Sequence, residues 1–169
     1  SYRDDLAEGI LRKSGNEAID NFMKNTFGYL VFQEQIIQFL HEYCGYTMGE
    51  ADIVRRHFAK KTGTEKDIPQ IKEGFAKTMA KDYGMSREES EEVIADFIQV
   101  IEDASNYLFS LNHSQPYSYE GYVSGWLRYY YPLEFLTVAL NINRDKEEKT
   151  NALIAYAHKM GIKINSPKF

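Results

Sequence analysis

The chain contains one cysteine and no long apolar run among its 169 residues. A single cysteine excludes an internal disulfide and is compatible with a reducing cytoplasm, where we expect the protein to reside. The apolar runs are only a few residues long, whereas a membrane-spanning helix needs about 20 apolar residues in succession. The opening residues, SYRDDLAEG, also lack the apolar core of a signal peptide. We therefore expect no membrane partner.

The residue patterns of several catalytic sites are missing as well. The sequence has no Asp-x-Asp pair and no glycine-rich phosphate loop of the Walker type. Asp4 and Asp5 are adjacent, and Glu50 and Asp52 are two residues apart, so the side chains of each pair diverge if they lie on helices. We therefore expect the chain to bind no metal ion and to carry no catalytic residue of its own.

The residues that are present are typical of one globular domain. Hydrophobic residues make up 43% of the chain and charged residues 27%, which is ordinary for a globular protein. A chain of 169 residues can bury a substantial core, and we expect residues 1–169 to form a single helical domain. Because the first residue is Ser rather than Met and the chain stops abruptly after residues 166–169, we also expect a segment of a longer protein.

Apolar residues recur at helical spacing along almost the whole chain. No convincing hairpin is present, so the predicted fold class is all-α. Capping boxes at residues 47–50 and 86–89 mark two helix starts. Residues 105–116 are predicted to form a loop, because Pro116 suits the first position of a following helix. The first four expected helices cover about residues 3–13, 16–25, 31–43 and 48–60. The next helix runs through 68–79 and ends at Gly84, and another runs from the cap at Ser86 to residue 104. The last three run through 119–130, 133–142 and 145–160.

Charge is unevenly distributed, with basic and acidic residues in separate blocks. Residues 55–81 contain eight basic and three acidic residues, a local charge of +5, whereas residues 85–103 have a local charge of −6. The basic block could serve a nucleic-acid partner, and the acidic block would repel one. Two solvated helix faces would account for the same pattern.

A recognisable order of motifs lies between residues 27 and 63. A helix that opens with FQEQ at 32–35 leads into the turn GYTMG at 45–49, and the next helix carries RR at 55–56 and KK at 60–61. This order resembles the fingers domain of the C-family bacterial DNA polymerases, the family of the DNA polymerase III alpha subunit. That family typically shows an aromatic-Gln-Glu-Gln run, a Gly-Tyr-Ser/Thr-x-Gly turn, a double arginine and paired lysines.

A second block of motifs resembles the same family. It reads YLFSLNH at 107–113, WLR at 126–128 and YPLEF at 131–135. The family's Tyr-x-Phe-Asn-Lys-Ser-His run has its Asn and Lys replaced here by Ser110 and Leu111, which indicates a divergent branch, such as one from a phage or a mobile element. Two blocks in register extend the resemblance over roughly residues 16–169.

The resemblance implies that the basic helix binds substrate. Arg55 and Arg56 would contact the triphosphate of the incoming deoxynucleotide (dNTP), and Lys60 and Lys61 would belong to the same substrate site. The residues alone offer partial support, because Arg56 and Lys60 are four apart and share a helix face. A guanidinium group can also donate two parallel hydrogen bonds to the oxygens of a phosphate. A basic helix end favoured by the helix dipole is the simpler explanation of the same residues.

The second block would supply DNA contacts. Asn112, His113 and Tyr117 would lie near the nascent base pair and the primer–template DNA, where an aromatic ring could stack on a base. The palm and other domains of the parent polymerase would supply the catalytic aspartates and Mg²⁺, so the fragment alone is expected to be inactive. By helical spacing, Trp126 and Phe135 are expected to be core residues.

A competing class is a helical binding module without a catalytic role, for nucleic acid or for another protein. A fingers domain should respond to triphosphates through Arg55 and Arg56. A general nucleic-acid module should bind DNA with a strong salt dependence and ignore nucleotides. A protein-binding module should do neither.

Overall fold

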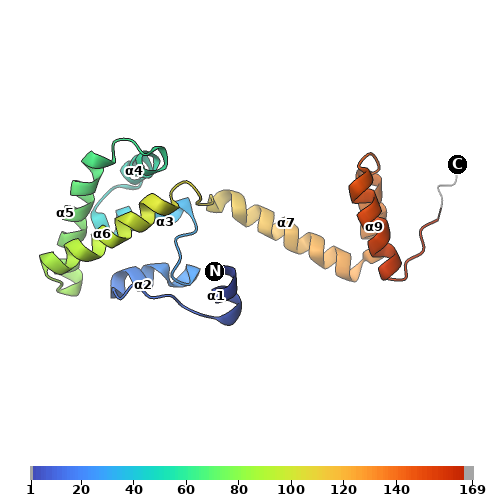
Figure 1. The fold of residues 1–169 in the computed structure, drawn as a ribbon, viewed down its shortest axis with the longest axis horizontal. Helices are drawn as coiled ribbons and strands as arrows, with labels where there is room; N and C mark the ends of the chain where they lie inside the picture. The colour runs from blue at the N-terminus through green and yellow to red at the C-terminus, as the bar shows by residue number, and fades with distance from the viewer. Residues whose placement is uncertain (1, 166–169) are drawn as a thin grey trace. The chain divides into compact units, whose positions relative to one another are not determined.

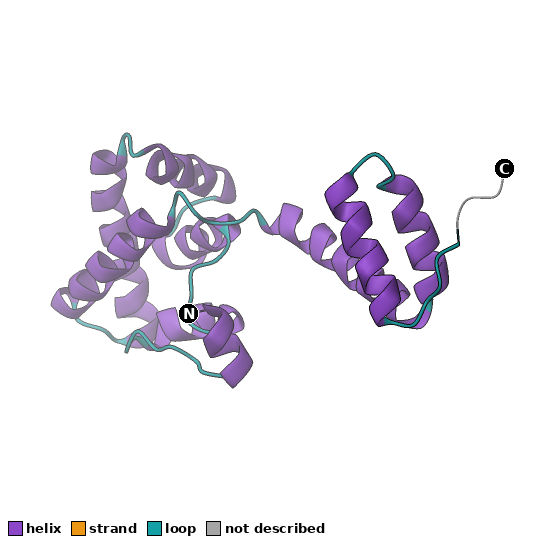
Figure 2. Ribbon diagram, turned by 45° about the vertical axis from the view of Figure 1, so that its right-hand side comes forward, coloured by secondary structure: helices purple, strands orange, loops and turns teal. Residues whose placement is uncertain are grey.

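The computed structural model describes residues 2–165, which are mostly helical (Figure 1). This range holds nine α-helices, one short 3₁₀ helix and no strand, which confirms the all-α prediction. Figure 2 shows the helices joined by loops and turns. The elements are α1 (Tyr2–Glu8), α2 (Glu17–Met23), η1 (Lys24–Thr26), α3 (Gln33–Cys44), α4 (Met48–Lys60), α5 (Thr64–Tyr83), α6 (Arg87–Ala104), α7 (Leu111–Tyr130), α8 (Pro132–Ile142) and α9 (Glu147–Lys159).

The chain divides into two compact units, where the sequence predicted one domain over residues 1–169. The boundary falls within α7, between Ser114 and Gln115. We call the part up to Ser114 the first unit and the part from Gln115 the second unit. No residue of α7 is buried, and a helix without buried side chains is a physical reason for a division at that point.

Phe39, on α3, lies at the centre of the core of the first unit. Its side chain is fully buried. The centroid of its ring lies 4.5 Å from that of Phe97 on α6 and 5.9 Å from that of Phe75 on α5. Phe22 and Tyr43 complete the cluster, with centroids at 5.6 and 5.4 Å from Phe39. The apolar stripe that the sequence predicted on this helix therefore packs into an aromatic cluster.

A glycine allows α3 and α5 to approach closely. A Cβ atom built on Gly74, in the middle of α5, would lie 2.0 Å from the carbonyl oxygen of Cys44 and 2.7 Å from its carbonyl carbon. No side chain fits in that space, so Gly74 brings the backbone of α5 against the C-terminal end of α3.

The turn between α3 and α4 forms as the sequence predicted. Gly45 ends α3 in the left-handed conformation, with φ of 77°. Thr47 then caps α4, because its hydroxyl accepts a hydrogen bond from the Glu50 amide and the Glu50 carboxylate accepts one from the Thr47 amide at 2.9 Å. The predicted capping box at residues 47–50 and the helix over residues 48–60 are confirmed.

The first helix is shorter than the predicted 3–13, because α1 ends at Glu8. Gly9 turns the chain with a left-handed φ of 69°. Arg12 then lies outside the helix, where its amide donates to the carbonyl of Phe27 at 3.1 Å and its Nε donates to Asp5 at 2.7 Å. These contacts with residues distant in sequence replace the last helical turn that local spacing predicted.

The predicted loop over residues 105–116 is also too long, because α7 begins at Leu111. The amide of Leu111 donates to the Glu34 carboxylate at 2.9 Å, and the carbonyl of Ser110 accepts from the amide of Ser114 at 2.9 Å. A carboxylate at the start of a helix satisfies its free amides and complements its dipole. Pro116 therefore lies inside α7 rather than at its start.

The second unit consists of the rest of α7 with α8 and α9. Leu136 and Ala157 are its buried apolar residues within the described range. The Arg128 guanidinium lies 3.7 Å from the centroid of the Tyr156 ring, a cation–π contact that joins α7 to α9. The prediction that Trp126 belongs to the core is wrong, because this side chain is 42% exposed. Phe135 is half-buried. None of the described helices is long and apolar enough to cross a membrane.

Candidate functional site

Arg55 is held in place by two neighbouring helices. Its Nε and Nη2 donate to Oδ1 of Asp52, one turn earlier on α4, at 3.0 and 2.9 Å. Its Nη1 donates to Oε1 of Gln33, at the start of α3, at 3.1 Å. The Arg55 side chain is only 17% exposed. A guanidinium with three such hydrogen bonds has a fixed orientation.

Arg56 shares the same carboxylate but is open to solvent. Its Nη2 donates to Oδ2 of Asp52 at 2.6 Å, and its side chain is 62% exposed. Asp52 therefore accepts two hydrogen bonds from Arg55 on Oδ1 and one from Arg56 on Oδ2. The hydrogen bonds from Arg55 are the largest cause that holds the pKa of Asp52 below its usual value. The hydrogen bond from Arg56 adds to this effect, and burial opposes it.

The two lysines lie further along the helix, and both are exposed. Lys60 is in the last turn of α4, four residues after Arg56, on the face that the sequence predicted. Lys61 follows the helix in the left-handed conformation, with φ of 52°. It lines a cavity of about 280 Å³ together with Phe58, Thr64, Gln99, Glu102 and Asp103.

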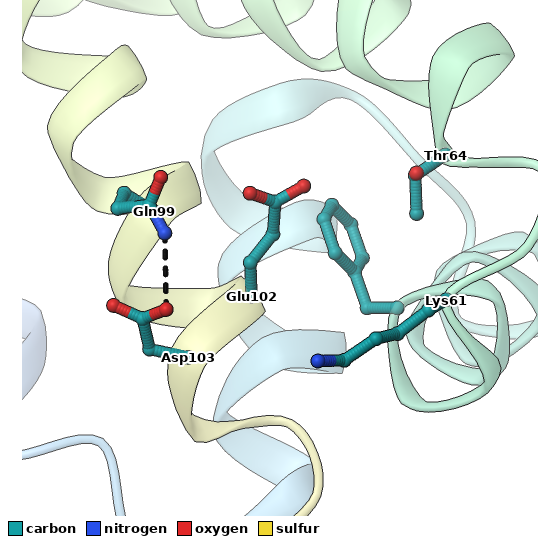
Figure 3. Close-up of a pocket in the computed structure, with 6 residues that line it drawn as sticks. Lys61, Thr64, Gln99, Glu102 and Asp103 are labelled. Atoms are coloured by element: carbon teal, nitrogen blue, oxygen red, sulfur yellow. Dashed lines mark hydrogen bonds between the residues drawn. The ribbon is translucent and has the colours of Figure 1, made fainter.

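Figure 3 shows Lys61 extending from the end of α4 toward α6, whose Glu102 and Asp103 line the same cavity. Asp103 accepts a hydrogen bond from Nε2 of Gln99 at 3.0 Å, and the opposite charges of Lys61 and the two carboxylates attract one another across the cavity. Arg55 in contrast faces Gln33 on α3. The four basic residues that the sequence assigned to one site are therefore divided. Arg55 and Arg56 donate to Asp52, Lys60 is exposed in the last turn of α4, and Lys61 lies at the cavity with Glu102 and Asp103.

The residues predicted for DNA contact are on a helix and not on a loop. All three residues, Asn112, His113 and Tyr117, belong to α7. This helix begins at Leu111, inside the predicted loop of residues 105–116. Asn112 and His113 fall in the first unit and Tyr117 in the second. The Tyr117 side chain is 63% exposed, and Asn112 and His113 are also exposed.

The first turn of α3 connects the arginine helix to the start of α7. Besides accepting from Arg55, Gln33 donates through Nε2 to the Leu108 carbonyl at 3.3 Å, and its amide donates to the Phe109 carbonyl at 2.9 Å. The neighbouring Glu34 accepts from the amide of Leu111. The FQEQ run at 32–35 thus has a structural explanation, which is that it ties together segments separated in the sequence.

Among residues 2–165, no group of three or more His, Cys, Asp or Glu side chains is arranged to hold a metal ion. Asp5 accepts hydrogen bonds from Tyr29 and Arg12, and Asp52 is engaged by Arg55 and Arg56. The described carboxylates therefore do not fit a two-metal site, which needs several oxygen ligands around each ion.

Sequence reasoning missed Asp52 and Gln33 as partners of the arginines. Asp52 had a signal, because residues three and four apart on a helix face the same side and opposite charges there attract. Gln33 had none, because its contact with Arg55 joins residues 22 positions apart in the chain.

Tyr46 offers a test of the turn that leads into α4. Its side chain is buried, burial raises its pKa to about 12, and its hydroxyl has no hydrogen-bond partner among the described residues. We expect Tyr46→Phe to leave the free energy of unfolding unchanged or to raise it by up to about 1 kcal/mol, because no bond is lost and a buried hydroxyl no longer needs a partner. Urea unfolding measures the change.

Tyr29→Phe is the matched control, because the hydroxyl of Tyr29 does donate, to Asp5. We expect that variant to be less stable than the wild type. Equal destabilisation by both substitutions would mean that the Tyr46 hydroxyl has a partner after all.

Comparison with known proteins shows which class of protein this chain is similar to. Residues 7–83, which include α3, α4 and α5, match the family model of the bacterial DNA polymerase III alpha subunit finger domain. This part of the chain is therefore similar to a polymerase finger domain, and it is all-α as the resemblance predicted.

Individual relatives extend the match beyond α5. The DNA polymerase III subunit alpha of Buchnera aphidicola is 32% identical over 167 residues, which are 99% of this chain and 13% of the relative. The protein of the same name from Thermus aquaticus is 32% identical over 145 residues, 86% of this chain and 11% of the relative. That from Escherichia coli K12 is 30% identical over 152 residues, 90% of this chain and 12% of the relative. Over most of its length the chain is therefore similar to the DNA polymerase III alpha subunit, and it spans about an eighth of the length of these relatives.

Proposed function

We propose that this chain is the part of a DNA-directed DNA polymerase that binds the triphosphate of the incoming dNTP during DNA replication. The observation that carries the proposal is the arginine pair on α4, with both guanidinium groups held by Asp52 and Arg56 open to solvent. Pairs of guanidinium groups suit the many oxygens of a triphosphate and can neutralise charge as pyrophosphate leaves. Lys60 lies on the same face and adds positive charge.

The role of Lys61 in this proposal is weaker than that of the arginines. It is one of the four predicted substrate-binding residues, but it lines the cavity that holds Glu102 and Asp103. We propose Arg55, Arg56 and Lys60 as the main triphosphate contacts, with Lys61 contributing only long-range attraction.

We further propose that primer–template DNA lies against the first half of α7, near Asn112, His113 and Tyr117. The exposure of these three side chains supports the proposal. An exposed tyrosine offers a face on which a base can stack. The palm and other domains of the parent polymerase would be the protein partners of this chain.

The chemical step would take place elsewhere in the parent enzyme. A polymerase needs carboxylates that hold Mg²⁺, and the described residues offer no such group. We therefore propose that the palm supplies these carboxylates, that the chain alone does not polymerise, and that the whole enzyme acts in the cytoplasm.

An NMR titration with dATP and Mg²⁺, with and without primer–template DNA, tests the triphosphate site. We expect shifts at the side chains of Arg55, Arg56 and Lys60. We expect Arg56→Ala to raise the dissociation constant at least about tenfold, because it removes an exposed charge-assisted contact. Lys81→Ala, at an exposed position near the end of α5, removes the same charge and should leave the affinity almost unchanged.

The other outcomes separate the competing classes. Broad, salt-sensitive shifts with DNA but none with dATP would favour a general nucleic-acid module. No response to dATP in the presence of primer–template DNA would contradict the proposed triphosphate site.

A further inference from the structure

Asp52 connects the two arginines of the proposed site. Oδ1 accepts from Nε and Nη2 of Arg55, and Oδ2 accepts from Nη2 of Arg56. All three residues lie on α4, where Arg55 is three residues and Arg56 four residues after Asp52. One carboxylate therefore orients two neighbouring guanidinium groups at once.

The hydrogen bonds leave both arginines able to bind a ligand. A guanidinium has five N–H donors. Arg55 uses three of them, two on Asp52 and one on Gln33, and Arg56 uses one, on Asp52. Two donors on Arg55 and four on Arg56 are not engaged by other described residues, which is enough to bind several phosphate oxygens while both contacts with Asp52 persist.

Asp52 has two opposite effects on an anionic ligand. Its negative charge lowers the local positive potential, which weakens the attraction of a triphosphate. Its hydrogen bonds hold two long and otherwise mobile side chains in fixed positions, so that less conformational entropy is lost when phosphate binds. The sign of the net effect shows which role is the larger.

Resting on the proposed function, we propose that Asp52 is a positioning residue for triphosphate binding, which holds Arg55 and Arg56 in the orientation that accepts the phosphates. Gln33 supports it by fixing Arg55 from the α3 side. Asp52 itself does not contact the ligand, and like charge keeps it away from the phosphates.

The test compares the wild type with Asp52→Asn in titrations with dATP and Mg²⁺ on primer–template DNA, and with Mg²⁺-free tripolyphosphate alone. We expect Asp52→Asn to raise the dissociation constant for dATP roughly tenfold, although the protein gains one unit of positive charge. The Nε–H resonance of Arg55, which donates to Asp52, should shift and lose protection from exchange in the free protein. Asp52→Glu keeps the charge with a longer side chain and should restore part of the affinity.

Glu65→Gln is the charge-matched control. Glu65 is an exposed carboxylate in the first turn of α5 and has no hydrogen bond or ion pair with either arginine in the described chain. Its replacement also adds one unit of positive charge and should leave the dissociation constant unchanged or slightly lower. Thermal unfolding of each variant shows whether any loss of binding comes from loss of the fold.

The outcomes separate this inference from the proposed function. If the wild type binds and Asp52→Asn binds as tightly or more tightly, Asp52 only competes for the arginines and the inference is overturned. If the wild type binds neither dATP nor tripolyphosphate, the proposed function fails and the inference fails with it.

Discussion

Replacing Phe39 with alanine is expected to lower the free energy of unfolding of the first unit by about 3–5 kcal/mol. The ring is fully buried and lies within 5.9 Å, centroid to centroid, of four other aromatic rings on α2, α3, α5 and α6. Its removal takes away apolar contacts with all of them. It also leaves a cavity that helices packed from several directions cannot fill by small shifts.

Urea unfolding followed by circular dichroism and by the NMR signals of buried isoleucines such as Ile36 and Ile94 measures this loss. Fluorescence of Trp126 is unsuitable, because this residue belongs to the second unit. Tyr107→Ala is the control, because Tyr107 is in the first unit but 82% exposed, and its loss should change stability by less than about 0.5 kcal/mol. Equal effects of the two substitutions would show that the aromatic cluster is not the centre of the core.

Gly74→Ala is expected to destabilise the first unit by about 2–3 kcal/mol, although glycine-to-alanine changes inside helices usually stabilise. The usual gain comes from the lower entropy of the unfolded chain and the better helix propensity of alanine. Here the new methyl group would overlap the carbonyl oxygen of Cys44 at 2.0 Å. Because that oxygen belongs to the backbone, α3 and α5 must move apart to admit the methyl group.

The matched control for Gly74 is Gly49→Ala, also on a helix of the first unit. Nothing lies within 4 Å of a Cβ atom built on Gly49. We therefore expect this variant to be at least as stable as the wild type. Comparison of the two denaturation midpoints measures the difference. A stable Gly74→Ala variant would mean that the contact between α3 and α5 can widen at little cost.

The helices of the first unit could largely be predicted from the sequence, because their signals are local. The spacing of apolar residues placed α3 through α6, and the caps at Thr47 and Ser86 marked the starts of α4 and α6 within one residue. The start of α7 could not be predicted in this way. The carboxylate of Glu34 that caps it lies 77 residues earlier in the chain than the Leu111 amide, and no local pattern reports such a contact.

The candidate site was predictable in its charges but not in its geometry. The arginine pair stood out as a motif, whereas the division between Arg55 and Lys61 depends on which neighbouring helix each side chain faces. The prediction that Trp126 is a core residue was wrong for a related reason. Helical spacing identifies an apolar face but does not show whether another element packs on it. Periodicity therefore predicted the elements better than it predicted the surroundings of single residues.

Cys44 makes this chain convenient for chemical labelling. The only thiol in the sequence is buried at the end of α3, and burial raises its pKa above the usual value, so it contains little of the reactive thiolate at neutral pH. Thiol reagents should therefore react little with Cys44 in the folded protein. Cysteines introduced on the surface, one in each unit, would then be the reactive thiols to which a spin label or fluorophore attaches. The distance between the two labels could be measured without first replacing Cys44.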